Sequence, residues 1–275
     1  MRLVSADWNF WPDGLDRADI WRLSASMGFS GMELGVYRAD DELSGTATAA
    51  ISVLARETGL GVDAVLFSMP PERWPEGGLG VAGPSARAVA ELTETARRAA
   101  DLGATVLGVW PGADAPADGD REGAWARTRD ALGEVADVTG PLGLKLAVEY
   151  KPGQLIAGAC DALRMVDDIG PGVGVLVDTA HAFAAGEDVA ALPALLAERI
   201  AHVHLGDSNG DPDADLPPGA EHDFAPFLDG LGGSGYAGVL SFDLYGAVVG
   251  GAFTGAEASR QGVFHVRDAL ARAGR

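Results

Sequence analysis

The sequence of 275 residues predicts an α/β protein with a single-domain (β/α)8, or TIM, barrel. Eight short apolar runs recur along the chain, and stretches with helical periodicity lie between them. Eight such units in about 250 residues match the size of this barrel. No linker, charge block or low-complexity segment divides the chain, so we expect one domain over residues 1–275.

Strands are expected at the apolar runs, most of which end in a polar residue. In chain order these runs are Leu3–Asp7, Gly31–Val36, Gly61–Phe67, Ala104–Trp110, Leu144–Glu149, Val173–Asp178, Ile200–Leu205 and Val239–Asp243. Side chains at the ends of these strands would meet at one mouth of the barrel, where the following loops build the active face.

Helices are expected where apolar residues recur at helical spacing among Ala, Arg, Glu and Leu. The clearest of them are Asp16–Met27, Thr46–Glu57, Ser85–Leu102, Arg121–Val138 and Ala256–Ala273. Glycines that stand between a helix and the next strand predict left-handed helix ends at Gly28, Gly59, Gly103, Gly143 and Gly172. A long loop is expected at 207–219, after the seventh strand.

The alternative architecture is an open doubly wound sheet, which would place a glycine-rich turn after its first strand. The first strand instead runs into Asp7-Trp8-Asn9-Phe10-Trp11-Pro12. We find no GxGxxG, Walker or GxSxG pattern at a junction of strand and helix. These absences argue against nucleotide cofactors and serine hydrolysis.

Net charge and cysteine content restrict the binding partners and the cellular compartment that we expect. The formal net charge of −20 would repel nucleic acid and anionic membranes. The start of the chain shows neither a signal peptide nor a membrane span, which predicts a cytoplasmic protein. The single cysteine, Cys160, has no disulfide partner in the chain and is expected as a small core residue in a reducing compartment.

Four consecutive strands each supply, at or near their ends, a side chain that can bind a metal ion. These side chains are Glu149, Asp178, His204 and Asp243. If the barrel forms, they converge at its mouth, where three carboxylates and one imidazole suit one Mn²⁺ or Mg²⁺ ion, with Co²⁺ or Zn²⁺ as alternatives. For Asp178, capping of the following helix is an alternative role.

At these strand ends the sequence resembles the sugar phosphate isomerase/epimerase superfamily, also called the xylose isomerase-like TIM barrels. The resemblance is strongest over Leu144–Tyr245 and rests on Glu149, on Asp178-x-x-His181 and on His202-x-His204-x-x-Asp207. It implies a divalent metal site formed by Glu149, Asp178, His204 and the carboxylate on strand eight. That carboxylate is Asp243 here in place of the usual Glu, so it would bind through water or from a displaced strand.

One branch of this superfamily is the endonuclease IV-type DNA repair enzymes, and residues 177–186 resemble its strand-six motif. That branch also uses histidines near strands three and four and an Asp-Arg-His motif after strand seven. The corresponding residues here are Ser68 and Pro111, and the loop lacks the motif. The multi-zinc cluster cannot be assembled, so AP endonuclease activity is disfavoured.

The segment Glu149-x-Lys151-Pro152 resembles xylose and rhamnose isomerases, in which the Lys polarises a substrate oxygen. Lys151 is one of only two lysines in the chain, which favours a specific role. The alternative is a structural ion pair between Lys151 and an acidic residue at the barrel rim.

The resemblance implies an isomerase or epimerase that acts on a small sugar, keto-sugar or cyclitol through an enediolate. A lyase or dehydratase of the same fold, acting on an inosose, a dehydroshikimate or a 3-keto glycoside, is the alternative, and a non-catalytic barrel is disfavoured. A homodimer or homotetramer would fit such an enzyme.

Residue roles follow from this chemistry. Glu149 and Asp243 would move protons, with Glu149 essential and Asp243 mainly a ligand, helped by Lys151 or His181. His202 would orient a metal ligand from one layer deeper. Substrate contacts are expected at Trp8, Trp110, His181, Glu33 and Asp207, whereas Trp11 is expected to pack at the mouth, and His222 and His265 to lie in a loop and on a helix surface.

Overall fold

Eight parallel strands close into a barrel in chain order, and β1 pairs with both β2 and β8. This computed structural model describes residues 1–82, 85–112 and 119–272. Its strands are β1 (Arg2–Ala6), β2 (Gly31–Val36), β3 (Gly61–Ser68), β4 (Val106–Trp110), β5 (Lys145–Glu149), β6 (Val173–Asp178), β7 (Ile200–Leu205) and β8 (Val239–Phe242). All eight begin and end within two residues of the expected positions, so the barrel is confirmed.

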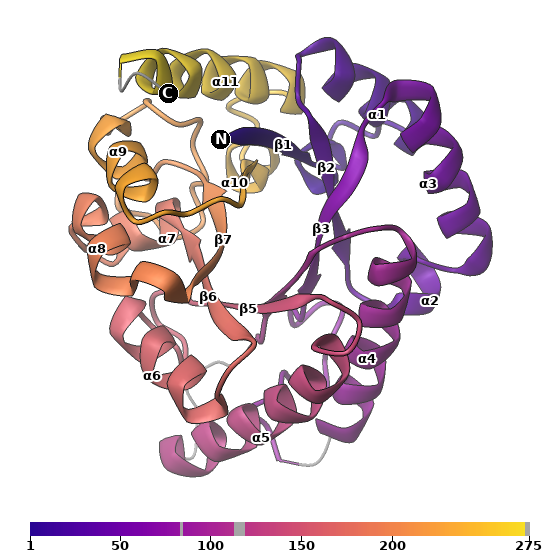
Figure 1. Ribbon diagram of the computed structural model, residues 1–275, viewed down its shortest axis with the longest axis vertical. Coiled ribbons are helices and arrows are strands. Elements are labelled where there is room, and N and C mark those ends of the chain that lie inside the picture. The colour runs from indigo at the N-terminus through magenta and orange to yellow at the C-terminus, as the bar shows by residue number, and fades with distance from the viewer. Residues whose placement is uncertain (83–84, 113–118, 273–275) are drawn as a thin grey trace.

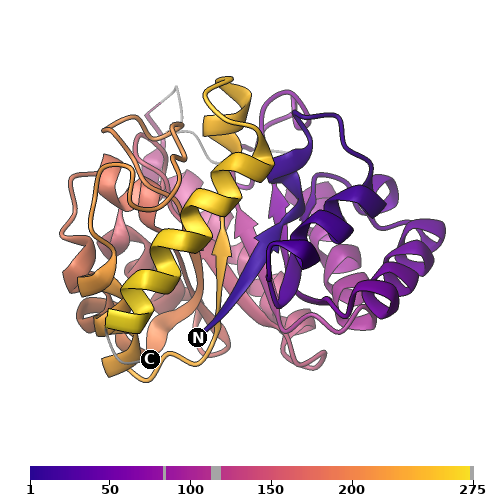
Figure 2. The same ribbon diagram turned by 90° about the horizontal axis from the view of Figure 1, so that it is seen from above.

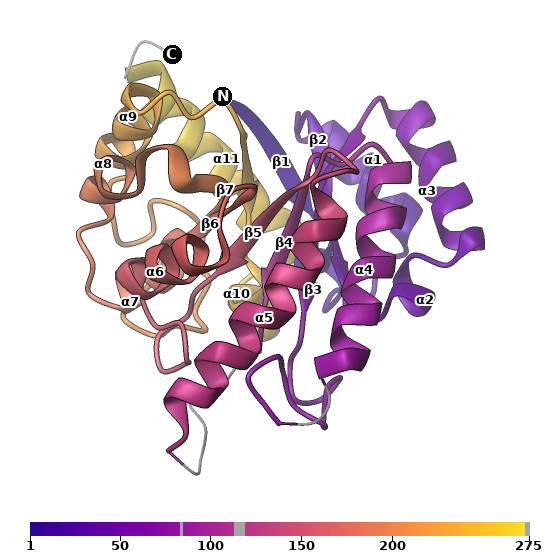
Figure 3. The same ribbon diagram turned by 60° about the horizontal axis from the view of Figure 1, so that its bottom comes forward.

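Helices form a ring around the strands (Figure 1). They are α1 (Arg17–Ser26), α2 (Ala39–Glu42), α3 (Gly45–Thr58), α4 (Ser85–Asp101), α5 (Arg121–Thr139), α6 (Ala159–Ile169), α7 (Thr179–Ala184), α8 (Leu192–Leu196), α9 (Ala225–Gly233), α10 (Tyr245–Val249) and α11 (Gly255–Arg272), with 3-10 turns η1 (Asp7–Phe10), η2 (Val189–Ala191) and η3 (Ala197–Arg199). The five helices expected from sequence are α1, α3, α4, α5 and α11. Figure 2 shows α11 lying across the side of the barrel where β1 and β8 meet, and Figure 3 shows α4 and α5 side by side.

Local sequence signals set several helix ends. Asp16 caps α1 by accepting a hydrogen bond from the Asp19 amide at 2.8 Å, and Ser44 caps α3 through the Ala47 amide. The five glycines expected in the left-handed region all have positive φ, between 75° and 91°. Each ends a helical segment or precedes a strand, as expected.

The core has two parts because successive strand residues point to opposite sides of a barrel wall. Val65 and Phe67 pack outward against the helices, whereas Ala64 and Leu66, which alternate with them along β3, point inward. The inner part is a smaller cluster formed by Ala6, Trp8, Ala64, Leu66, Val106, Ala147, Leu176 and Ala201. Mostly small side chains fill the barrel interior and leave its mouth open for polar residues.

Two expectations about side-chain burial are wrong. Cys160 is exposed near the start of α6, where it faces solvent instead of the core. His265 is half-buried on α11, with its ring 6.2 Å from that of Phe224. Among the described helices, none is both long enough and apolar enough to span a membrane.

Candidate metal and substrate site

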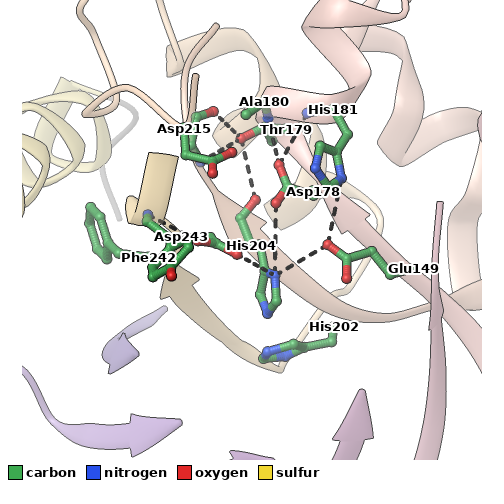
Figure 4. A network of polar contacts seen from close by, with 12 residues as sticks. Glu149, Asp178, Thr179, Ala180, His181, His202, His204, Asp215, Phe242 and Asp243 are labelled. Atoms are coloured by element: carbon green, nitrogen blue, oxygen red, sulfur yellow. Dashed lines mark hydrogen bonds and ion pairs between the residues drawn. The ribbon is translucent and has the colours of Figure 1, made fainter. Parts of the chain in front are cut away.

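His204 Nδ1 lies at the centre of three carboxylates at the mouth of the barrel. It is 3.7 Å from Glu149 Oε1, 3.8 Å from Asp178 Oδ2 and 3.8 Å from Asp243 Oδ2. Figure 4 shows these side chains converging from β5, β6, β7 and the end of β8. The structure therefore brings together the four residues that the sequence predicted as metal ligands.

The donor atoms of this cluster fit a divalent cation. Asp178 Oδ2 and His204 Nδ1 are buried and have no hydrogen-bond partner among the described residues. Metal bonds of about 2.1 Å place donor atoms roughly 3 to 4 Å apart, which matches the spacing around His204. Three groups of described residues meet the geometric requirement: Glu149–Asp178–His181 and Asp178–His204–Asp243 at the mouth, and Glu33–His202–His204 beneath them. The chain thus supplies oxygen and nitrogen ligands at one point.

Asp178 caps α7 with one carboxylate oxygen and faces the cluster with the other. Its Oδ1 accepts hydrogen bonds from the amides of Ala180 at 2.7 Å and His181 at 3.2 Å, so it caps α7. Its Oδ2 has no hydrogen-bond partner among the described residues and faces His204. Because α7 begins immediately after β6, the cap also fixes His181 beside the site.

Asp243 reaches the cluster despite its shorter side chain. It is the first residue after β8, and its Oδ1 accepts hydrogen bonds from Trp8 Nε1 at 2.9 Å and from the Tyr245 amide at 3.3 Å. Its Oδ2 is as far from His204 Nδ1 as the Asp178 oxygen is. Direct contact between Asp243 and an ion shared with His204 therefore requires no displacement of the strand.

The cluster is electrostatically polarised. Burial raises the pKa of Asp243 to about 6, with Asp178 adding to the rise and His204 opposing it. Burial also works against the charge on Glu149, but His204 and His181 hold the Glu149 pKa below its usual value. Burial would lower the His204 pKa, yet Glu33 and Glu149 raise it well above its usual value. The site favours positive charge at its centre.

His181 faces the same site with a defined tautomer. Its Nδ1 lies 3.1 Å from the Tyr150 carbonyl oxygen, which can only accept a hydrogen bond, so Nδ1 carries the proton. The Tyr150 hydroxyl donates to Glu187 Oε2 at 2.9 Å, and Glu187 Oε1 accepts from the Ala159 amide at 2.8 Å. This chain of contacts leaves His181 Nε2 available to a ligand.

Glu33 has a different position from the one expected. It is fully buried inside the barrel, with Oε2 2.8 Å from His202 Nε2 and Oε1 3.2 Å from His204 Nε2. Glu33 is absent from the cavity lining, which corrects the expectation that it accepts a substrate hydroxyl. His202 lies one layer deeper than His204, as expected, and is also fully buried.

Asp207 organises a loop instead of lining the cavity. Its Oδ2 accepts hydrogen bonds from the amides of Gly219, Glu221 and His222, and its Oδ1 lies 2.6 Å from His222 Nδ1. The carboxylate is fully buried. These contacts close the ends of the loop at 207–219 and correct the expectation that Asp207 binds a substrate hydroxyl.

A cavity of about 450 Å³ opens above the cluster. Its aromatic lining consists of Trp8, Trp11, Tyr37, Trp110 and Tyr245, and its charged or titratable lining consists of Glu149, Lys151, His181, Asp213, Asp215 and Asp243. Trp8 and Trp110 lie where expected, and Trp11 lines the cavity as well as packing against Tyr37. A Cβ at Gly35 would come within 2.8 Å of the Trp11 ring, so this glycine lets the ring lie against β2.

Asp213, Asp215 and Gly246 line one side of this cavity and were not predicted from the sequence. Lys151 forms an ion pair with Asp213 in the loop after β7, and its ammonium lies 5.6 Å from the Trp110 ring centroid. Asp215 accepts a hydrogen bond from the Gly246 amide at 3.0 Å. A Cβ at Gly246 would meet the Asp213 carbonyl oxygen at 1.9 Å, so the loop requires glycine there. The only sequence signal for these contacts was the length of the loop at 207–219.

Comparison with known proteins agrees with the barrel fold. The fold is similar to an L-ribulose 3-epimerase (20% identity, covering 100% of this chain and 96% of that chain, TM-score 0.80), to an AP endonuclease, family 2, from Brucella melitensis (20%, 92% and 99%, 0.75) and to a 3-keto-D-glucoside 4-epimerase from E. coli (18%, 91% and 98%, 0.72). No curated protein matched the sequence. The pattern of one family matches residues 21–268, and the chain therefore belongs to the xylose isomerase-like TIM barrel family.

Proposed function

We propose that this protein is a divalent-metal-dependent isomerase or epimerase of a small sugar, keto-sugar or cyclitol. The observation that carries the proposal is the His204 cluster, in which three carboxylates surround one imidazole at the floor of an aromatic-walled cavity. Two of the similar folds belong to sugar epimerases, which supports this class of reaction.

Glu149, Asp178, His204 and Asp243 would hold the ion. Their mixture of hard oxygen ligands and one nitrogen suits Mn²⁺ or Mg²⁺ first, and Co²⁺ or Zn²⁺ second. When bound, a divalent ion supplies a Lewis acid that stabilises negative charge on neighbouring substrate oxygens. The pKa of His204 is raised in its acidic surroundings, which agrees with a site that attracts a cation.

Glu149 is the group best placed to move the proton. It lines the cavity, and no donor within the described ranges makes a hydrogen bond to its Oε2. Removing a proton from the carbon beside the substrate carbonyl would give an enediolate, and Glu149 would carry that proton until it is returned. Both oxygens of Asp243 are already engaged, by Trp8 and by the cluster, which favours a ligand role for Asp243.

His181 and Lys151 would bind substrate oxygens. The Tyr150 carbonyl fixes the His181 proton on Nδ1, so Nε2 can accept a hydrogen bond from a substrate hydroxyl. Lys151 lines the cavity through an ammonium that Asp213 orients. The ion pair supports the structural role considered for Lys151 and is compatible with contact to a substrate oxygen.

The aromatic walls suit a sugar ring or chain, because C–H groups pack against the flat faces of Trp8 and Trp110. The cavity is lined by four carboxylates, and the net charge of the chain is −20. Both features favour a small polyol over nucleic acid.

The direct test is metal analysis followed by NMR of the loaded enzyme with a panel of ketoses and cyclitols in D₂O. We expect one ion per chain and incorporation of deuterium at one carbon beside the carbonyl, with an epimer or isomer as product. An eliminated water would identify a dehydratase instead. His204→Ala should bind no ion while keeping its circular dichroism spectrum; full occupancy in this variant, or two tightly held zinc ions in the wild type, would contradict the assignment.

A further inference from the structure

Glu33 lies beneath the proposed metal site and contacts two imidazoles at once. It stands on β2, whereas His202 and His204 stand two residues apart on β7, so both rings enter the barrel interior. Each carboxylate oxygen faces one ring: Oε2 is 2.8 Å from His202 Nε2, and Oε1 is 3.2 Å from His204 Nε2. All three side chains are fully buried.

The position of the protons follows from the chemistry of these groups. Each carboxylate oxygen lies within hydrogen-bond distance of one Nε2 atom, and a carboxylate accepts hydrogen bonds from the nitrogens that it contacts. Both Nε2 atoms must therefore carry a proton. In a neutral imidazole the other nitrogen then holds the lone pair, and in His204 this is Nδ1, which faces Glu149, Asp178 and Asp243.

We propose that Glu33 is a positioning residue that holds His204 with its proton on Nε2 and turns the Nδ1 lone pair toward the ion. This inference rests on the proposed metal site and is independent of which sugar reaction takes place there. Carboxylates that fix the outer nitrogen of a metal-binding histidine contribute to metal affinity without touching the ion.

His202 has a separate part in this arrangement. Its ring centroid is 5.1 Å from that of His204 at an angle of 82°, and its Nδ1 has no partner among the described residues. Within the described part of the chain, its ring makes one hydrogen bond, to Glu33. His202 therefore acts on His204 indirectly, by holding the carboxylate of Glu33 in place.

The decisive variant is Glu33→Gln, which keeps the shape of the side chain and changes its hydrogen bonding. An amide has one acceptor oxygen and one donor nitrogen, so it can accept from only one of the two Nε2 atoms, and its neutral oxygen is a weaker acceptor than a carboxylate. We expect the affinity for Mn²⁺ alone, measured by titration calorimetry, to fall about 10- to 100-fold. His202→Gln keeps a side-chain N–H that can donate to Glu33 Oε2, so the carboxylate stays beside His204 and the loss of Mn²⁺ affinity should be smaller than in Glu33→Gln.

A double variant separates positioning from general damage to the core. In Glu33→Gln with His202→Leu, the His204 ring is the one imidazole left beside residue 33. The amide oxygen can then accept from His204 Nε2 with no second ring competing for it. Much of the lost Mn²⁺ affinity should return, although the second change removes another buried polar group. If both changes acted only through stability, the double variant would bind more weakly than either single variant.

NMR distinguishes the two tautomers of His204 directly. In wild-type protein loaded with Zn²⁺ and labelled with ¹⁵N-histidine, His204 should show a hydrogen-bonded Nε2–H proton and a Zn²⁺-shifted Nδ1. A proton on Nδ1 would overturn the proposal even if no Glu33 variant folds, and so would wild-type Mn²⁺ affinity in a folded Glu33→Gln protein. If wild-type protein binds no divalent ion, it is the proposed function that fails.

Discussion

Trp8 Nε1 donates a hydrogen bond to Asp243 Oδ1 at 2.9 Å, which ties the residue after β1 to the residue after β8. These strands are neighbours because the barrel closes between them. With Oδ1 engaged, Asp243 presents Oδ2 to His204. One indole thus lines the cavity and also orients a proposed metal ligand.

Trp8→Phe should weaken the metal site. Phenylalanine keeps an aromatic wall but cannot donate to Asp243, so the carboxylate can rotate away from His204. We expect Mn²⁺ affinity to fall about tenfold, as measured by calorimetry. Trp11→Phe is the matched control, because Trp11 lines the same cavity and its described contacts include no proposed ligand. Equal losses in both variants would assign the effect to packing.

Glu149→Gln should stop exchange of the substrate C–H proton with D₂O even when Mn²⁺ is saturating. Loss of a general base typically costs about 10² to 10⁴ in rate, and the amide cannot accept the proton. Asp243→Glu should keep measurable exchange, because a carboxylate remains at the ion. NMR of deuterium incorporation measures both variants.

Two outcomes would contradict these roles. One is an Asp243→Glu enzyme that binds the ion and shows no exchange. The other is full exchange rates in both Lys151→Met and His181→Ala, since the proposal gives these residues contact with substrate oxygens.

Asp207→Asn should loosen the loop at 207–219. The carboxylate accepts from three backbone amides through Oδ2, and an amide group there would direct N–H toward some of these donors. We expect a loss of about 2 to 4 kcal/mol in unfolding free energy and faster proteolysis within the loop. Asp211→Asn changes an exposed residue of the same loop that accepts from one amide at its Oδ1, and it should have a much smaller effect.

Asp7→Asn should change how stability depends on pH. Burial raises the Asp7 pKa to about 7, although the Gly35 amide donates to its Oδ1. In the unfolded chain the pKa is about 4, so the stability supplied by protonated Asp7 is complete below about pH 4 and is lost as pH rises through about 7. Asparagine keeps the acceptor for Gly35 and cannot ionise.

The measurement for this variant is urea unfolding at about pH 5 and about pH 8. From about pH 5 to about pH 8, the unfolding free energy of Asp7→Asn should rise by roughly 2 kcal/mol relative to that of the wild type. A parallel pH dependence of the two proteins would show that Asp7 ionises at its ordinary pKa in the folded state.

The barrel and the His204 cluster could be predicted because both depend on order along the chain. Repeating apolar runs define the strands, and the last residue of each parallel strand lies at the same mouth. Glu149 and Asp178 end their strands, His204 is the last residue but one of β7, and Asp243 directly follows β8. Their convergence therefore needs no knowledge of loop structure.

The contacts of Glu33, Lys151 and Asp207 could not be predicted in this way. Glu33 meets His202 and His204 across the barrel interior, where contact depends on strand tilt and stagger rather than on sequence separation. Lys151 pairs with Asp213 through the path of a loop that has no periodic pattern. Cys160 was placed wrongly because residue type alone does not reveal which face of α6 is covered.

Asp178 makes the start of a helix and the floor of the site a single unit. One of its oxygens caps α7 and the other faces His204. Binding of a cation should therefore stabilise α7, and a well-formed α7 should favour binding of the cation. A glutamate would keep the charge but would carry it one carbon farther from the helix end. The length of the side chain at position 178 must therefore suit the helix end and the cluster at the same time.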